Sequence, residues 1–192
     1  MLDFLIELDK SWFLFFNGFH NAFFDSLMYF ISGTKTWIPL YLVVLFFIFK
    51  NLNWKGFLVL FFLILLIVLA DQGSVTLFKN TFQRLRPCHN PEFANLVHLV
   101  NNECGGKFGF ISSHAANTFA FATFTALFFN NKSFSIPIFL WAIIVSYSRI
   151  YLGVHYPFDV LGGAFFGISI GYIISLAYQL AYKKIIEIKK PR

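Results

Sequence analysis

Two long runs without a charged residue place the strongest constraint on the fold of this chain. Trp37–Phe49 and Phe57–Ala70 consist of apolar and aromatic residues and one proline. Each run merges with weakly polar flanks into a segment of about 15 to 22 residues, close to the length of about 20 that crosses a bilayer. Of the 192 residues, 58% are hydrophobic and only 12% are charged. A water-soluble fold would have to bury too much of this surface, so the sequence indicates an integral membrane protein.

The apolar segments after Gly33 predict five spans, at residues 36–50, 56–78, 113–130, 134–150 and 158–181. Polar side chains interrupt residues 1–33, which form either an interfacial helix followed by a short helix or one imperfect crossing. This first segment has acidic residues where a cleavable signal has basic ones, so we expect it to remain in the mature protein. The predicted fold is an all-α, polytopic transmembrane bundle of five to six spans, with residues 1–192 forming a single domain.

Basic residues collect on one predicted side of the membrane, namely Lys50, Lys55, Lys132, Lys183, Lys184, Lys189, Lys190 and Arg192. The positive-inside rule makes this side, with the C-terminus, cytoplasmic. The loop at 79–112 and the turn "YLGVHYP" then face outward, although they carry or adjoin Lys79, Arg84, Arg86, Lys107 and Arg149. These outward cations need an explanation other than topology. The net charge of +6 is scattered along the chain, so we expect no nucleic-acid binding.

The chain contains two cysteines, Cys88 and Cys104, and both lie in the predicted outward loop. In an oxidising compartment they would form a disulfide that stabilises the loop by about 3 kcal/mol through chain entropy. The alternative is a pair of free thiols. We favour the disulfide because neither cysteine has another obvious partner.

Three outward segments carry polar residues that suit a phosphate group. Taken singly, a cation at a helix end is usually an interfacial anchor and a serine at a helix start is usually a cap. Together they supply several cations, a hydroxyl and the free backbone N–H groups of a helix N-terminus, which favour an anion with several oxygens. The predicted phosphate-binding residues are Lys79, Arg86, Ser112, Ser113 and Arg149.

Two histidines add chemistry to this predicted phosphate site. His155 and Asp159 are four residues apart at the start of a predicted helix, where the carboxylate can accept a hydrogen bond from Nδ1. Nε2 of His155 would then be free to act as a nucleophile at phosphorus. His114 would protonate the leaving oxygen and later activate water. The outward loop has no carboxylate cluster and the chain has no HExxH motif, so we expect no metal and no cofactor.

These residues resemble the type 2 phosphatidic acid phosphatase superfamily, the lipid phosphate phosphatases. The family pattern is Lys, six residues, Arg-Pro; then Pro-Ser-Gly-His; then Ser-Arg, five residues, His, three residues, Asp. Lys79, Arg86 and Pro87 match the first motif, and Ser148, Arg149, His155 and Asp159 match the third. The second motif departs from the pattern, with Ile111 in place of proline and Ser113 in place of glycine.

The resemblance implies a helical membrane bundle, a phosphohistidine intermediate on His155, protonation by His114 and no metal requirement. It implies that the substrate is a lipid phosphate and that the protein is surrounded by membrane lipids. We expect no obligatory protein partner. The short chain is most similar to bacterial undecaprenyl diphosphate phosphatases, so the favoured substrate is undecaprenyl diphosphate. Phosphatidylglycerol phosphate, phosphatidic acid and lipid A phosphate are the alternatives. The expected location is the bacterial inner (cytoplasmic) membrane, with the site facing the periplasm.

Two other classes of function compete with this interpretation. A transporter would use the cations to hold a phosphate head group without cleaving it, but it would leave the spacing of His155 and Asp159 unused. Haloperoxidase chemistry with bound vanadate suits soluble enzymes better than this chain.

Two further features indicate helix packing. Gly163, Gly167 and Gly171 lie four residues apart on one helical face, which allows close approach of another helix. Asp71 lies within an apolar segment, where an intramembrane carboxylate usually has a function. We favour a structural role for Asp71, because the three motifs already supply an acid, a base and a nucleophile.

Overall fold

The computed structural model describes residues 2–92 and 94–188, and all the regular elements within them are helical. The four helices of the first half are α1 (Leu2–Gly18), α2 (Ala22–Ser32), α3 (Ile38–Leu52) and α4 (Gly56–Gly73). The long helices of the second half are α6 (Ser113–Phe129), α7 (Lys132–Tyr151) and α8 (Pro157–Ile188). The short elements are η1 (Thr34–Trp37), η2 (Asn53–Lys55), the π-helical turn η3 (Ser74–Lys79), α5 (Asn80–Phe82), η4 (Pro87–His89), η5 (Ala94–Leu96) and η6 (Val100–Asn102).

Each of the five predicted spans coincides with a long helix, namely α3, α4, α6, α7 and α8. Three helical segments are long and apolar enough to cross a membrane, at Thr34–Phe82, Lys132–Tyr151 and Pro157–Ile185. The first of these contains both α3 and α4, which are joined at η2. The all-α prediction is therefore confirmed, whereas the total of five to six spans stays a prediction.

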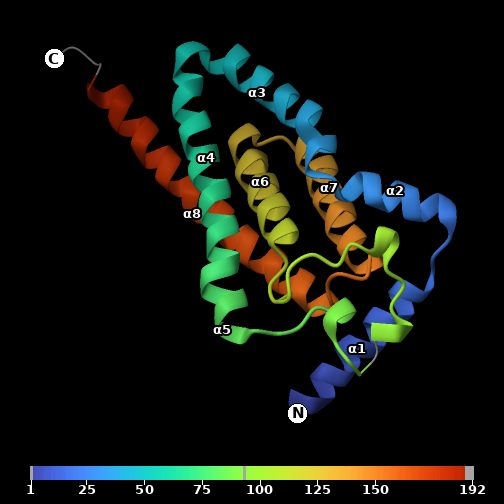
Figure 1. The fold of residues 1–192 in the computed structure, drawn as a ribbon. Coiled ribbons are helices and arrows are strands. Elements are labelled where there is room, and N and C mark those ends of the chain that lie inside the picture. Colours follow the sequence, from blue (N-terminus) through green and yellow to red (C-terminus); the bar gives the residue numbers. More distant parts are fainter. Residues whose placement is uncertain (1, 93, 189–192) are drawn as a thin grey trace.

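Residues 2–33 contain two helices, as the first of the two sequence interpretations predicts, whereas the position of this segment relative to the membrane stays a prediction. The chain leaves α1 at Gly18, and Asn21 caps α2 by accepting a hydrogen bond from the backbone N–H of Phe24 at 3.0 Å. With 11 residues, α2 is about half the length of a span. Figure 1 shows α1 near the start of α8, close to the loops that precede α6.

The two ends of the bundle differ in the segments that they bring together. The α3–α4 turn, the α6–α7 turn and the C-terminal end of α8 lie at one end (Figure 1). The loop that follows α5 and the turn between α7 and α8 lie at the other end. The predicted orientation depends on this alternation of successive turns between the two ends. Lys50, Lys55 and Lys132 lie in or beside the α3–α4 and α6–α7 turns, at the same end as the C-terminal end of α8. Lys189, Lys190 and Arg192 lie outside the described residues.

The closest helix contact joins α6 and α8, and it depends on the predicted glycine face. A Cβ atom on Gly163 would collide with the carbonyl oxygen of Ser112, and one on Gly167 with that of Ala116. One turn further on, a Cβ on Gly171 would lie 2.7 Å from the carbonyl oxygen of Ala120. Three glycines of α8 thus face three successive turns of the α6 backbone, which confirms the packing prediction.

Large apolar side chains cover the outside of the bundle. Phe46, Phe57 and Phe165 are 62%, 66% and 76% exposed, although each lies in the middle or at the start of an apolar helix. Exposed apolar surface of this extent marks a membrane or protein contact in a folded chain. The pattern fits helices that face lipid.

Replacing Gly167 with alanine tests the α6–α8 contact. The new Cβ would meet backbone atoms of Ala116, which cannot move without separating the helices. We expect Gly167→Ala to lower the free energy of unfolding by about 1–3 kcal/mol, measured by thermal unfolding in detergent micelles. Gly18→Ala is the matched control, because nothing lies within 4 Å of a Cβ at that position. Equal stability of the two variants would contradict the proposed backbone contact.

Candidate active site

Two connections hold the predicted site residues at the start of α6 and of α8. Ser112 is the N-cap of α6, and its side chain accepts a hydrogen bond from the N–H of Ala115 at 3.4 Å. The backbone N–H of Ser112 donates to the carbonyl of Asp159 at 2.9 Å. Pro157 begins α8, where its missing N–H costs nothing. The N-termini of the two helices are therefore tied together.

His155 and Asp159 form the pair that the sequence spacing predicts. Nδ1 of His155 lies 3.4 Å from Oδ2 of Asp159, and the two residues are 1% and 0% exposed. The same carboxylate oxygen accepts a hydrogen bond from the backbone N–H of Tyr156 at 3.0 Å. Asp159 is thus fixed against the Nδ1 side of the imidazole, which leaves Nε2 free of this contact.

The predicted cations surround His155. Burial first, and then the positive charges of Arg86 and Arg149, lower the pKa of His155 well below its ordinary value. The charge of Lys79 acts in the same direction. The imidazole is therefore neutral at neutral pH, which is the protonation state that a nucleophile requires.

Lys79 and Ser113 are in direct contact. Nζ of Lys79 donates to Oγ of Ser113 at 2.7 Å, and this hydroxyl is also 2.6 Å from Oγ of Ser74. Ser113 stands where the family pattern has glycine, so its side chain adds a hydroxyl to the site. Lys79 ends the π-helical turn η3, a type of helix distortion that is frequent at functional sites.

Arg86 is held by the carbonyl groups of the outward loop. Its Nε donates to Phe108 at 3.3 Å, and one of its terminal nitrogens donates to Cys104 at 3.1 Å. Burial lowers the pKa of Arg86, but an arginine side chain stays protonated. Cys104 is bonded to Cys88, the pair that the sequence analysis favours as a disulfide. The disulfide thus fixes the loop segment that orients Arg86.

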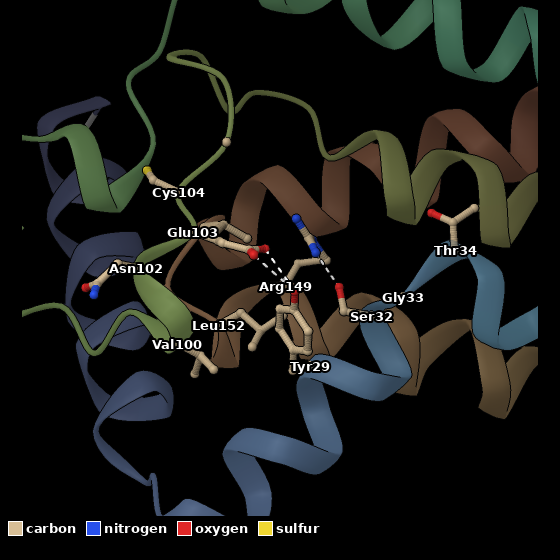
Figure 2. Close-up of a pocket in the computed structure, with 12 residues that line it drawn as sticks. Tyr29, Ser32, Gly33, Thr34, Val100, Asn102, Glu103, Cys104, Arg149 and Leu152 are labelled. Atoms are coloured by element: carbon tan, nitrogen blue, oxygen red, sulfur yellow. Dashed lines mark hydrogen bonds between the residues drawn. The ribbon is translucent and has the colours of Figure 1, made fainter.

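Arg149 lies between the site and a cavity of about 550 Å³ beside it. Figure 2 shows its guanidinium group next to Ser32, whose Oγ accepts a hydrogen bond from it. The Nε atom of Arg149 is buried and has no hydrogen-bond partner among the described residues. A buried donor without a partner is costly, so this side chain is suited to bind an added acceptor.

All eight predicted site residues gather at one end of the bundle. His114 is the second residue of α6, and the first N–H groups of a helix have no partners within it. Ser112 is fully buried and serves as the N-cap of α6. Three cations, a helix N-terminus and two histidines can hold a phosphate group and transfer it.

Sequence reasoning missed the two residues that support Asp159 from the opposite side. Arg84 donates to Oδ1 of Asp159 at 2.9 Å and to Oδ2 of Asp9 at 2.7 Å. Asp9 is completely buried, although it belongs to α1, at the far end of the chain from Asp159. The only signal in the sequence was the position of Arg84 among outward cations that the positive-inside rule does not explain.

Other polar residues of the region tie helices and loops together. Asp71 accepts a hydrogen bond from Asn117 at 3.3 Å, which links α4 to α6 and agrees with a structural role. Nε2 of His98 lies 2.9 Å from a carboxylate oxygen of Asp25, and its ring stacks on that of His20. Within residues 2–92 and 94–188, no cluster of three or more histidine, cysteine or acidic side chains is placed to hold a metal ion.

Comparisons with known proteins show the family of this chain. The PAP2 superfamily model matches residues 57–183. A lipid A 4'-phosphatase of Bacteroides thetaiotaomicron is 42% identical over 186 residues, which are 95% of this chain and 81% of that protein. A lipid A 4'-phosphatase of Porphyromonas gingivalis is 36% identical over 94% of this chain and 77% of its own length.

Two solved structures share the fold. The crystal structure of Aquifex aeolicus LpxE superposes with a TM-score of 0.68 at 30% identity, over 89% of this chain and 96% of that one. A transmembrane phosphatidylglycerolphosphate phosphatase from Bacillus subtilis has the same TM-score at 23% identity, over 97% of this chain and 88% of that one. With the three motifs assembled at one end of a helical bundle, the chain belongs to the PAP2 superfamily and is a membrane lipid phosphatase.

Proposed function

We propose that this phosphatase removes a phosphate from the sugar head group of lipid A or a similar glycolipid. The observation that carries this proposal is the match to two lipid A 4'-phosphatases over more than nine-tenths of the chain. Undecaprenyl diphosphate, which the sequence favoured, becomes the second candidate. It is supported by an undecaprenyl-diphosphatase of Bacillus subtilis that is 31% identical over 80% of this chain.

The first chemical step is attack by His155 on phosphorus. The lone pair of Nε2 forms the N–P bond while the bond from phosphorus to the lipid oxygen breaks. Asp159, 3.4 Å from Nδ1, stabilises the positive charge that develops on the imidazole. His114 gives its proton to the leaving oxygen, which departs as an alcohol of the lipid.

The second step returns the enzyme to its starting state. His114, now without its proton, accepts one from a water molecule as the water oxygen attacks phosphorus. The N–P bond breaks, inorganic phosphate leaves, and Nε2 of His155 regains its lone pair. No metal or redox partner is needed to balance either step.

The phosphate oxygens are held by the three cations and by α6. Lys79, Arg86 and Arg149 neutralise the charge that the transferring group spreads over its equatorial oxygens. The free N–H groups at the start of α6 donate to the same oxygens. Ser113 contributes a hydroxyl that is already bonded to Lys79 at 2.7 Å.

The proposed location is the inner membrane of a bacterium, with the site at its periplasmic face and the C-terminus in the cytoplasm. The support is the distribution of lysines over the two ends of the bundle. Lys50, Lys55 and Lys132 lie at the end opposite the site (Figure 1).

Replacing the proposed nucleophile tests the mechanism. We expect His155→Ala to lower the rate of phosphate release by at least about a thousandfold, because no other group can form the covalent intermediate. Wild-type protein quenched during turnover should carry an acid-labile phosphate that His155→Ala lacks. The control is His89→Ala, which removes an exposed loop histidine. Full turnover by His155→Ala would rule out the mechanism.

A panel of lipids tests the substrate. We expect the highest kcat/KM with lipid A that carries a phosphate on its sugar, compared with undecaprenyl diphosphate, phosphatidylglycerol phosphate and phosphatidic acid in the same detergent. The measurement is phosphate release by one protein preparation. Preference for undecaprenyl diphosphate would support the second candidate. Tight binding of these lipids without phosphate release would instead indicate a transporter.

A further inference from the structure

The cavity beside Arg149 has a polar lining that the three motifs do not account for. It lies between the C-terminal end of α2 and residues 100–105 of the outward loop, and its volume of about 550 Å³ is within the usual range for ligand pockets. Figure 2 shows Tyr29 and Glu103 in its lining, joined by hydrogen bonds of 3.0 and 3.2 Å from the phenol to the carboxylate.

The phosphate site lies at one side of this cavity. Arg149 lines the cavity, and so does Gly105, at which a Cβ would be 3.3 Å from a terminal nitrogen of Arg86. A phosphate bound between Arg86 and Arg149 would therefore place the lipid head group to which it is attached at the entrance to the cavity.

The residues that line the cavity indicate which kind of head group fits it. Hydroxyl and carboxylate groups come from Tyr29 and Glu103, and apolar surface comes from Leu152 and Val154. Such a mixture matches a sugar ring, which has hydroxyl groups at its edge and C–H groups on its faces. The negative charge of Glu103 disfavours a second phosphate in the same space.

The position of Glu103 is fixed by its neighbours along the chain. Asn101 and Asn102 both adopt the left-handed conformation, with φ of 55°, which asparagine tolerates better than most residues. Cys104, on the other side, is held by the disulfide to Cys88. A carboxylate held in this way is preorganised to accept hydrogen bonds from a ligand.

We propose that this cavity is the head-group subsite of the enzyme and takes the uncharged, hydroxylated sugar ring that carries the phosphate. Glu103 and Tyr29 hydrogen-bond to its hydroxyl groups, and Val154 and Leu152 contact its C–H face. This inference rests on the proposed function, since it names the part of the molecule that distinguishes a glycolipid phosphate from other lipid phosphates.

Two variants test the subsite: Glu103→Ala, which removes the acceptor, and Thr34→Trp, which fills the cavity from η1. We expect each to lower kcat/KM for the sugar-borne phosphate of lipid A about tenfold, the effect of losing one good hydrogen bond or its equivalent contact. Phosphatidic acid has no ring, so its kcat/KM should change by less than about twofold. Glu92→Ala is the control, because Glu92 belongs to the same loop but pairs with Lys10.

The outcomes separate the subsite from the proposed function. A selective loss on lipid A supports the subsite. An equal loss on both lipids, or no loss on either, overturns it while the wild-type activity on lipid A stands. Wild-type protein that cleaves phosphatidic acid or undecaprenyl diphosphate but not lipid A overturns the proposed substrate, and the subsite with it.

The contacts of Arg84, which do not involve this cavity, support a second inference. Its guanidinium group lies between two fully buried carboxylates and stacks on the ring of Tyr156, with 4.0 Å from Cζ to the ring centroid. The second carboxylate, Asp9, also accepts a hydrogen bond from the N–H of Phe158 at 2.8 Å. Arg84 and Asp9 thus hold the first turn of α8 from the side opposite His155.

We infer that Arg84 is a positioning residue, which keeps Asp159 ionised and directed at His155, and that Asp9 holds Arg84 in place. Because Arg84 has no assigned contact with the phosphate, its loss should affect the chemical step more than binding. We expect Arg84→Gln to lower kcat at least about tenfold with KM changed by less than about twofold, and Arg84→Lys to restore part of kcat.

Thermal unfolding is measured alongside, and Lys107→Gln is the control, since Lys107 is an exposed cation of the same loop. Should Arg84→Gln fail to fold, Asp9→Asn provides the same comparison, with a smaller expected fall in kcat at constant KM. A wild-type kcat in the folded variant, or a change in KM alone, overturns the assignment.

Discussion

The close contact between α6 and α8 is the constraint on which the rest of the site depends. Gly163 and Gly167 let the backbone of α8 lie directly on carbonyl groups of α6, and the N–H of Ser112 reaches the carbonyl of Asp159 at 2.9 Å. Because both helices begin at this contact, the free N–H groups of one N-terminus and the histidine of the other connection face the same space. A larger residue at either glycine would separate the two histidines that the chemistry requires.

The site concentrates positive charge that the protein itself only partly neutralises. Buried charges are tolerated when they are paired, and Arg84 has two carboxylate partners. Arg86 and Arg149 are held mainly by uncharged oxygens, and Nε of Arg149 has no partner among the described residues. An arriving phosphate would supply the missing negative charge. Burial first, and then the same charges, lower the pKa of His155 and so favour the neutral imidazole that the proposed mechanism requires.

Reaction and substrate choice are assigned to different parts of the structure. In the proposed mechanism the three motifs supply the groups that transfer a phosphate, and they would serve any lipid phosphate equally. The proposed head-group subsite is lined by the end of α2, by residues 100–105 of the disulfide-linked loop and by Leu152 and Val154, and Arg149 is the motif residue that it shares with the phosphate site. Loops on a rigid scaffold commonly carry specificity in this way, because they can change without disturbing the helix contacts.

The sequence by itself determined the helices and the glycine face, and it predicted the disulfide and eight site residues, because each follows from a local pattern such as an uncharged run or a fixed spacing. The tertiary structure alone decided which partners those residues have. Asp9 and Arg84 are 75 residues apart, and nothing local in either segment indicates that they meet beside Asp159. The cavity that Tyr29 and Glu103 line likewise exists only once α2 lies against the outward loop. Long-range contacts depend on how the helices pack, and packing is set by all the side chains together rather than by any one motif.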